Sequence, residues 1–265
     1  SINLNFSEKF AWTPGKLENE ENSHGVTSKA FNMGDKNQIL FRDEFLLKWD
    51  IETGELLDKK SITELLIKNG LEGEMKKAHF HLGPYHINDI QPVLKSSLEL
   101  IQDDLLISIR NMSSIIHYRP ETGKVIRLIK GPFSFQHDVD FLNDSTLTLF
   151  NNNSINRTEL SYDYVKSSSK IDTLSISTSQ ILRYDYATKV FDTLFRKQMR
   201  ENKIFTHFEG VHHWLGDEKL LVEEKDDGFI WIFDGKKVVY KNVLKSKEIN
   251  GHHYMLNWIR VIDLR

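Results

Sequence analysis

A histidine-led unit of short apolar segments recurs four times along the 265-residue chain, and this repeat constrains the fold more than any other feature. Each unit opens on a segment that carries one of four histidines: His24, His86, His137 and His212. An apolar run follows each histidine, with QILFR at 38–42, LLISIR at 105–110, TLTLF at 146–150 and KLLVE at 219–223. Runs rich in β-branched and aromatic residues, bounded by turn residues, are typical of β-strands.

The second half of each unit repeats as well. A third segment ends in an aromatic residue followed by an acidic or turn-like element: Trp49-Asp50, Tyr118-Arg119-Pro120, Tyr184-Asp185 and Phe233-Asp234. A turn that carries Gly or Lys then leads into a fourth segment, at 54–57, 123–126, 189–191 and 236–239. Four short strands per unit predict an all-β fold, a β-propeller of four-stranded blades. A two-sheet sandwich is the alternative, but it does not explain the repeated order.

Two segments at the ends of the chain are left over from the repeat. The segments 2–12 and 252–262 could pair as one shared blade, which would close the ring and protect its edges. We therefore expect a single propeller domain over 1–265 with five blades, or six if the N-terminal segment forms its own. The stretch at about 151–177, rich in Asn and Ser, predicts a loop excursion. One helix is expected at 61–68, with Ser61 as its N-cap and Glu64 closing a capping box.

Charge and composition exclude several classes of protein. The 35 Lys and Arg residues nearly balance the 38 Asp and Glu residues, and no long basic block occurs, so we expect no nucleic-acid partner. No apolar run approaches the length of a membrane span. The absence of cysteine excludes disulfides and thiolate metal sites. The first residue is Ser rather than Met, which indicates a processed or trimmed chain.

The repeat also predicts where the chemistry lies. The first strand of each propeller blade lines the central channel, so the four repeat histidines are expected to converge on one face. Arg110 ends the LLISIR run, and its guanidinium could bind a tetrahedral oxyanion through paired N–H donors. Two chemistries suit this set: metal binding, with Asp138 and Asp140 as oxygen ligands, and transfer of a sulfuryl or phosphoryl group. The metal alternative has little local support, and we expect neither a metal nor a cofactor.

Aromatic side chains beside the histidine segments could form a lip that holds an aromatic substrate, although packing between blades is the alternative for most of them. These residues are Tyr85, Phe133, Phe135, Phe208 and Trp214. No Gly-rich loop that could cradle a phosphate occurs, so a nucleotide donor is not expected.

The segment 85–153 carries four short motifs in a specific order. They are His86-Ile87-Asn88, the SIR of 108–110, Gln136-His137-Asp138 and the LFNNN of 149–153. Their order and approximate spacing resemble the His-x-Asn, Ser-x-Arg, Gln-His-Asp and Leu-Phe-Asp-Asn-Gly elements of the arylsulfotransferase family of β-propellers, aryl-sulfate sulfotransferases that need no nucleotide donor. A weaker likeness extends over 24–49 and 209–242. The LFNNN segment departs from the family by lacking the acid and the glycine.

The resemblance implies a ping-pong reaction in which His137 takes the sulfuryl group from a phenolic sulfate ester and passes it to a phenolic acceptor. His86, Asn88 and Arg110 would then hold the sulfuryl oxygens and stabilise the developing charge. His24 matches an earlier channel histidine of the family, whereas His212 is added from the repeat alone. We thus expect His137, His86 and Arg110 to be catalytic, and Asn88, His24 and His212 to bind substrate.

The family resemblance further implies a periplasmic or extracellular protein, and a cytoplasmic location stays open as the alternative. Two other functions stay open, because one fold can host several activities. The first is a propeller enzyme of the same scaffold that performs different small-molecule chemistry, as a lyase or a hydrolase. The second is a non-catalytic propeller that binds a ligand or a protein.

Overall fold

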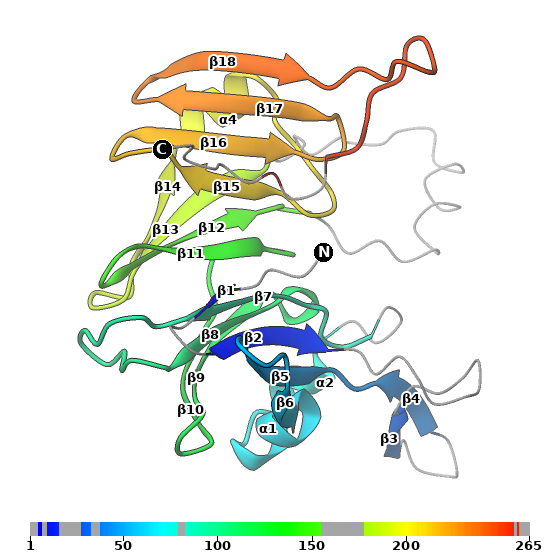
Figure 1. Cartoon of the computed structure of the whole chain (residues 1–265), viewed down its shortest axis with the longest axis vertical. Coiled ribbons are helices and arrows are strands. Elements are labelled where there is room, and N and C mark those ends of the chain that lie inside the picture. The colour runs from blue at the N-terminus through cyan, green and yellow to red at the C-terminus, as the bar shows by residue number, and fades with distance from the viewer. Residues whose placement is uncertain are drawn as a thin grey trace, which may run out of the picture. The chain divides into compact units, whose positions relative to one another are not determined.

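The part of the chain that the structure describes is mostly β, with 47% strand and 11% helix, which confirms the all-β prediction. The computed structural model describes residues 5–6, 10–15, 28–32, 38–78, 83–154, 178–256 and 259, and within these the side chains of 10–15, 41–78, 83–154, 178–256 and 259. Four antiparallel sheets of four strands each contain most of the described strands (Figure 1). They are the four-stranded blades that the repeat predicts.

Three of the four sheets follow the predicted strand order. The second sheet contains β7 (Ile87–Pro92), β8 (Leu105–Ile109), β9 (Ser114–Arg119) and β10 (Lys124–Ile129). The third contains β11 (His137–Asn143), β12 (Thr146–Asn151), β13 (Gln180–Asp185) and β14 (Phe191–Leu194). The fourth contains β15 (Val211–Trp214), β16 (Lys219–Glu224), β17 (Phe229–Asp234) and β18 (Lys237–Val243). Each of these sheets thus opens within one residue of a repeat histidine.

The first sheet differs from the prediction in its composition. It contains β1 (Asn5–Phe6), β2 (Phe10–Gly15), β5 (Phe45–Asp50) and β6 (Leu56–Ser61), with β2 paired to β5 from Phe10↔Asp50 to Gly15↔Phe45. The QILFR run, predicted as a strand of this blade, is β4 (Gln38–Arg42) and pairs instead with β3 (Ser28–Asn32) in a separate two-stranded sheet. This hairpin pairing is local, and β2 takes the place beside β5 by burying Ala11 and Trp12.

The N-terminal strands complete the first sheet rather than pairing with the C-terminal segment. In the part of 252–262 that the structure describes, the β-type pairing present is the isolated bridge between His253 and Lys245. The predicted shared blade is therefore not found among the described residues, and the count of five or six blades stays a prediction.

Buried apolar side chains form three clusters, each with residues from more than one sheet. One joins β8 and β9 to helix α1 (Ile62–Lys68) through residues such as Leu66 and Ile107. A second packs Leu147 of β12 against Tyr184 of β13. The third surrounds Trp231 of β17. All five residues of β8 are buried, as expected for a strand covered on both faces.

The predicted helix is present. Helix α1 follows Ser61, whose hydroxyl accepts the Glu64 N–H at 3.1 Å, as an N-cap should. Two further helices, α2 (Glu72–Lys76) and α4 (Arg196–Glu201), are shorter and were not expected. None of the described helices is long and apolar enough to cross a membrane.

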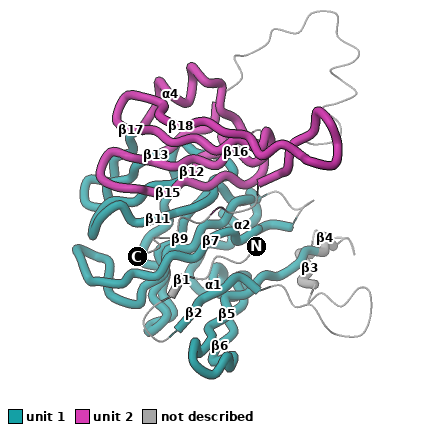
Figure 2. The backbone as a smooth tube through the Cα atoms, turned by 45° about the horizontal axis from the view of Figure 1, so that its top comes forward, with its two compact units in different colours: residues 1–149, 182–192 teal, residues 150–181, 193–265 magenta. Residues whose placement is uncertain are grey.

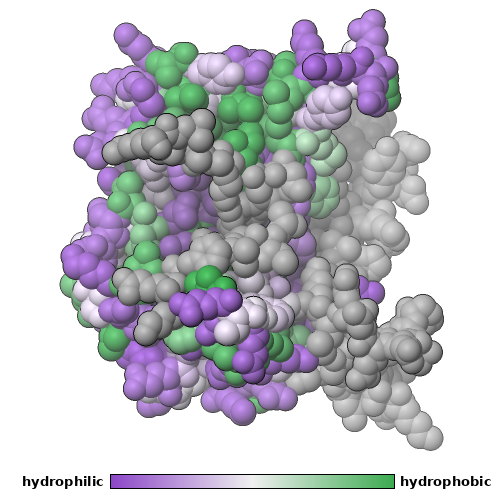
Figure 3. All heavy atoms as spheres, in the orientation of Figure 1, coloured by the Kyte–Doolittle hydropathy of each residue, from purple (hydrophilic) through white to green (hydrophobic). Residues whose placement is uncertain are grey.

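The chain divides into two compact units (Figure 2). Unit 1 contains residues 1–149 and 182–192, and unit 2 contains residues 150–181 and 193–265. Strands β12, β13 and β14 contribute to both units, and the single domain over 1–265 stays a prediction. Most of the predicted excursion, 155–177, lies outside the described residues. In space-filling view, apolar side chains gather over the unit 2 strands at the top of the picture (Figure 3).

Candidate active site

Four of the six predicted site residues lie together in unit 1. His86 immediately precedes β7, Asn88 lies in β7, and His137 is the first residue of β11. Arg110 follows β8 and begins a short 3₁₀ turn (Arg110–Met112). The rings of His86 and His137 are 6.4 Å apart between centroids and meet edge to face at 74°. Segments distant in sequence thus bring two imidazoles into one cluster.

Arg110 joins this cluster through both its backbone and its side chain. Its N–H donates to the His86 carbonyl at 3.1 Å, and its guanidinium carbon lies 4.4 Å from the centroid of the Phe135 ring. The Nη1 group donates to Asn111 Oδ1 at 2.9 Å. The residue is only 4% exposed, so the arginine does not extend to solvent. A buried guanidinium stacked on an aromatic ring presents rigid donors to a bound anion.

His137 is held in one tautomer. Its Nδ1 lies 3.1 Å from the Phe135 carbonyl oxygen, which can only accept a hydrogen bond, so Nδ1 carries the proton in the neutral ring. Nε2 then carries the lone pair. The residue is 1% exposed. Neutral imidazole with a defined lone pair is the nucleophilic form of histidine.

The segment that carries His137 is anchored from two sides. The buried Gln136 donates through Nε2 to Ser108 Oγ at 3.1 Å on β8 and to the Ser114 carbonyl at 2.9 Å on β9. From β7, Asn88 Nδ2 donates to the Gln136 carbonyl at 2.6 Å. Asn88 therefore positions the residue beside His137, and the second N–H of its amide could contact a ligand. The sequence did not reveal the anchoring role of Gln136.

The backbone around this cluster adopts unusual conformations. In and beside the cluster, four residues other than glycine have a positive φ: His86 (56°), Ser113 (44°), Phe135 (56°) and Asp138 (52°). A side chain in the left-handed region costs about 1 kcal/mol or more, and such residues cluster at functional sites. The neighbouring contacts must therefore hold these conformations.

Buried carboxylates supply part of that support. Glu44, 7% exposed, accepts the His86 N–H at 3.0 Å with Oε1 and the Ile87 N–H at 2.7 Å with Oε2. Asp89 of β7 accepts the Val139 N–H of β11 at 2.7 Å. Glu44 thus fixes the backbone at His86, and Asp89 fixes the backbone two residues after His137. Neither was singled out from the sequence, and a carboxylate that accepts backbone N–H groups belongs to no sequence motif.

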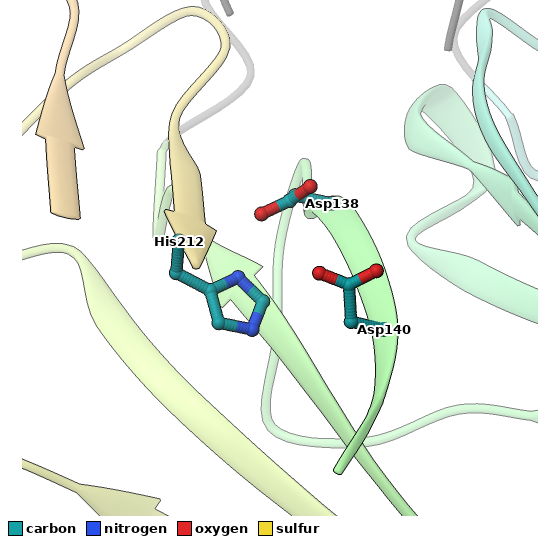
Figure 4. Close-up of side chains that lie close together, drawn as sticks. All are labelled: Asp138, Asp140 and His212. Carbon is teal, nitrogen blue, oxygen red and sulfur yellow. The ribbon is translucent and has the colours of Figure 1, made fainter. Parts of the chain in front are cut away.

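Asp138 and Asp140 project their carboxylates from the same side of β11 (Figure 4). Asp138 is 2% exposed and Asp140 is half-buried. Carboxylate oxygens of this kind are ligands that Mg²⁺, Ca²⁺ and Mn²⁺ prefer. Asp138 and Asp140 are the two oxygen ligands of the alternative in which the site binds a metal ion.

The two remaining predicted site residues lie elsewhere. His24 lies outside the described residues. His212 lies in β15 of unit 2, where it faces Val222 of β16 and is 1% exposed; it is the third residue labelled in Figure 4.

The predicted aromatic lip is only partly in place. Tyr85 is fully buried in the first core cluster, where its hydroxyl contacts Thr63 and Met75. Phe135 lies under Arg110. In unit 2, Trp214 packs against Phe195, whereas Phe208 is 50% exposed. Packing therefore accounts for Tyr85 and Trp214, as the alternative expectation has it.

A second buried histidine of unit 1 has a different environment. His117 Nε2 contacts Asp104 Oδ2 at 2.7 Å, and Nδ1 contacts the Tyr186 hydroxyl. Arg119 donates to both Asp104 oxygens at 2.8 and 2.7 Å. Burial lowers the pKa of His117 despite the carboxylate beside it. Burial opposes ionisation of Asp104, but its hydrogen bonds from Arg119, Ile101 and His117 outweigh this and lower its pKa.

Comparison with solved structures returns propeller proteins at low identity. The chain is 12% identical to the RRP9 WD40 repeats (TM-score 0.42, 91% of this chain, 56% of that chain) and to the Dos1 propeller (0.44, 95%, 61%). It is also 12% identical to a DUF4221 family member from Bacteroides vulgatus (0.43, 95%, 66%). The chain thus spans 56–66% of the length of these structures. No curated protein sequence matches it.

A family comparison is more specific. The family model described as Arylsulfotransferase (ASST) matches residues 23–242. This match includes the four motifs of 85–153 as well as both segments of weaker likeness, so the resemblance seen in the sequence is confirmed over most of the chain. The protein, an all-β chain of propeller blades, therefore belongs to the arylsulfotransferase family.

Proposed function

We propose that the protein transfers a sulfuryl group from a phenolic sulfate ester to a phenolic acceptor, with His137 as the covalent carrier. The observation that carries this proposal is the cluster of His86, Arg110 and His137 in unit 1, in a chain that matches the arylsulfotransferase family. Within it, the Phe135 carbonyl fixes the tautomer of His137 that a nucleophile needs.

In the first half-reaction, Nε2 of His137 attacks the sulfur of the ester. The N–S bond forms as the bond between sulfur and the phenolic oxygen breaks, and the phenolate takes a proton from protonated His86. Arg110 and the second N–H of Asn88 hold the sulfuryl oxygens, where negative charge accumulates. The Nδ1–H bond to the Phe135 carbonyl persists and supports the positive charge that the sulfated ring carries.

The second half-reaction reverses these steps with a new phenol. His86 accepts the proton of the acceptor hydroxyl, the phenolic oxygen attacks sulfur, and the N–S bond breaks. The electron pair returns to Nε2, so His137 and His86 end in their starting states. The cycle moves one SO₃ group between two phenols and needs no oxidant, nucleotide or metal. His24 and His212 would bind the substrates, and we propose a periplasmic or extracellular location from the family resemblance.

The test is a reaction with excess 4-nitrophenyl sulfate in the absence of an acceptor. We expect a burst of nitrophenol and a protein mass increased by one SO₃ group, both lost in His137→Ala and kept in His252→Ala, a substitution at an exposed histidine. A phenolic acceptor should then discharge the adduct. Steady release of nitrophenol without an adduct would instead indicate a hydrolase, and neither adduct nor release would indicate a binding protein.

A further inference from the structure

Unit 2 contains a cavity of about 840 Å³ beside helix α4. Its lining comes from α4 and the residues that follow it, from Thr193 of β14, from Asn153 shortly after β12, and from residues 178–180 at the beginning of β13. All of its lining residues belong to unit 2. The volume is in the range of small-molecule sites in proteins.

Three cationic side chains line this cavity: Arg196, Arg200 and Lys203. Arg196 and Arg200 are four residues apart on α4 and so share one face of the helix. Among the described residues, no carboxylate lines the cavity and none of the three cations has an acidic partner. Lys197 on the same helix differs, because it is paired with Glu201 at 3.8 Å. No described carboxylate of the lining therefore offsets the positive charge of these three side chains.

A neutral donor accompanies these cations. The Asn153 N–H donates to Asn151 Oδ1 at 2.9 Å, which assigns the other atom of the Asn151 amide, Nδ2, as a donor. That nitrogen donates to Gln180 Oε1 at 3.0 Å. The remaining polar atom of the Gln180 amide is therefore its nitrogen, also a donor, and Gln180 lines the cavity.

We infer that this cavity binds a small molecule that carries two or more negative charges on phosphate or sulfate groups. Guanidinium groups bind the oxygens of such groups through paired N–H donors, and three cations match a multivalent anion better than a monovalent one. The cavity is lined by residues of one unit and opens to solvent, where Arg196, Arg200 and Lys203 are exposed. Because the chain as a whole has a net charge of −3, this concentration of positive charge is local. This inference does not depend on the proposed sulfuryl transfer.

Isothermal titration calorimetry with inorganic pyrophosphate and with inorganic sulfate tests the inference. The variant is Arg196→Gln/Arg200→Gln, and the matched control is Lys197→Gln/Lys237→Gln, which removes the same charge from exposed positions of unit 2 outside the cavity. We expect one site per chain, an affinity about tenfold or more weaker in the cavity variant, and little change in the control. Nitrophenol release from 4-nitrophenyl sulfate should be the same in both variants.

Each outcome decides the inference. Binding of pyrophosphate alone assigns the site to phosphate compounds, and binding of sulfate alone assigns it to sulfate compounds. Equal weakening in the cavity variant and the control would show attraction by surface charge only and would overturn the proposal. Failure of both anions to bind the unmodified protein would also overturn it.

Discussion

Two buried histidines of unit 1 show how differently the same side chain can be used. Side-chain partners occupy both ring nitrogens of His117, the Asp104 carboxylate on one side and the Tyr186 hydroxyl on the other. The ring of His137 is oriented by a backbone carbonyl at Nδ1 and lies edge to face with a second imidazole. A positive φ occurs at His86, Phe135 and Asp138 around His137, whereas His117 has none and is paired in β9 with Leu106 of β8.

We interpret this difference as one between a structural histidine, His117, and the proposed nucleophile, His137. The network of His117 contains a carboxylate, a phenol and the Arg119 guanidinium, which together satisfy its polar groups inside a core. The His137 cluster instead places strained backbone and a buried guanidinium around one imidazole, an arrangement typical of functional sites. Substitutions should therefore impair activity in one cluster and stability in the other.

The largest effect is expected for His137→Ala. Loss of the proposed covalent carrier should lower the rate of sulfuryl transfer about a thousandfold or more. Substrate binding and contacts to the sulfuryl oxygens alone supply only a small part of the rate enhancement of the complete site. Initial rates with 4-nitrophenyl sulfate and a phenolic acceptor measure this. The comparison of the two histidines would fail if His117→Gln, assayed well below its melting temperature, lost as much activity as His137→Ala.

Arg110→Gln should have the next largest effect. Removing the guanidinium takes away charge-assisted donors to the sulfuryl oxygens and should lower kcat/KM about 100-fold or more. Arg110→Lys keeps the charge but loses the forked geometry, so its kcat/KM should lie between those of the unmodified protein and Arg110→Gln. Steady-state kinetics of the three proteins measures the order. Unchanged kinetics in Arg110→Gln would remove Arg110 from the site.

Asp104→Asn should act on stability rather than on chemistry. The change leaves His117 and Arg119 without their shared carboxylate and should reduce the free energy of unfolding by about 3 kcal/mol. Urea unfolding gives this value, and the activity of the folded fraction should stay near that of the unmodified protein. A loss of activity with unchanged stability would contradict the structural role of this network.

Glu44→Gln should have a smaller effect, on both stability and activity. The amide keeps one acceptor but places an NH₂ group against the N–H of His86 or Ile87, which should cost about 1–2 kcal/mol of stability. Misplacement of His86 should also lower kcat about tenfold. Unfolding and kinetics of the same preparation test both effects. A variant that loses stability but keeps full kcat would limit Glu44 to a structural role.

The smallest effect is a pH dependence of stability. Burial lowers the pKa of His117 in the folded protein below the 6.5 of an exposed histidine. As the pH falls through 6.5, the unfolded chain binds a proton that the folded protein does not, so stability decreases. Urea unfolding at pH 7.5 and 5.5 should show a smaller decrease in His117→Gln. An equal decrease would show that His117 does not contribute to the acid sensitivity.

Much of the fold could be predicted because its strands are local and punctuated by turns. The 105–110, 146–150 and 219–223 runs are strands of three successive sheets. The first sheet could not be predicted, since the apolar runs of β2 and β4 are both suitable partners for β5 and only the local hairpin with β3 decides between them. Choice of partner among similar strands depends on tertiary packing, which a single sequence does not show.

The candidate site could be predicted in part for a similar reason. Repeat position and motif order identified His86, Arg110 and His137, which the structure brings together. Glu44 and Asp89 were missed because they act on backbone N–H groups of distant segments. The left-handed conformations at His86 and Phe135 also lack the glycine or asparagine that would have signalled them.

The most direct test of the central claim is to locate the sulfuryl group on the protein. The chain is mixed with 4-nitrophenyl sulfate, digested at mildly alkaline pH to preserve the N–S bond, and its peptides are sequenced by tandem mass spectrometry. We predict one additional SO₃ group on His137, which disappears when a phenolic acceptor is added. An SO₃ group on His86 or another residue, or sulfated product formed with every peptide unmodified, would contradict the account.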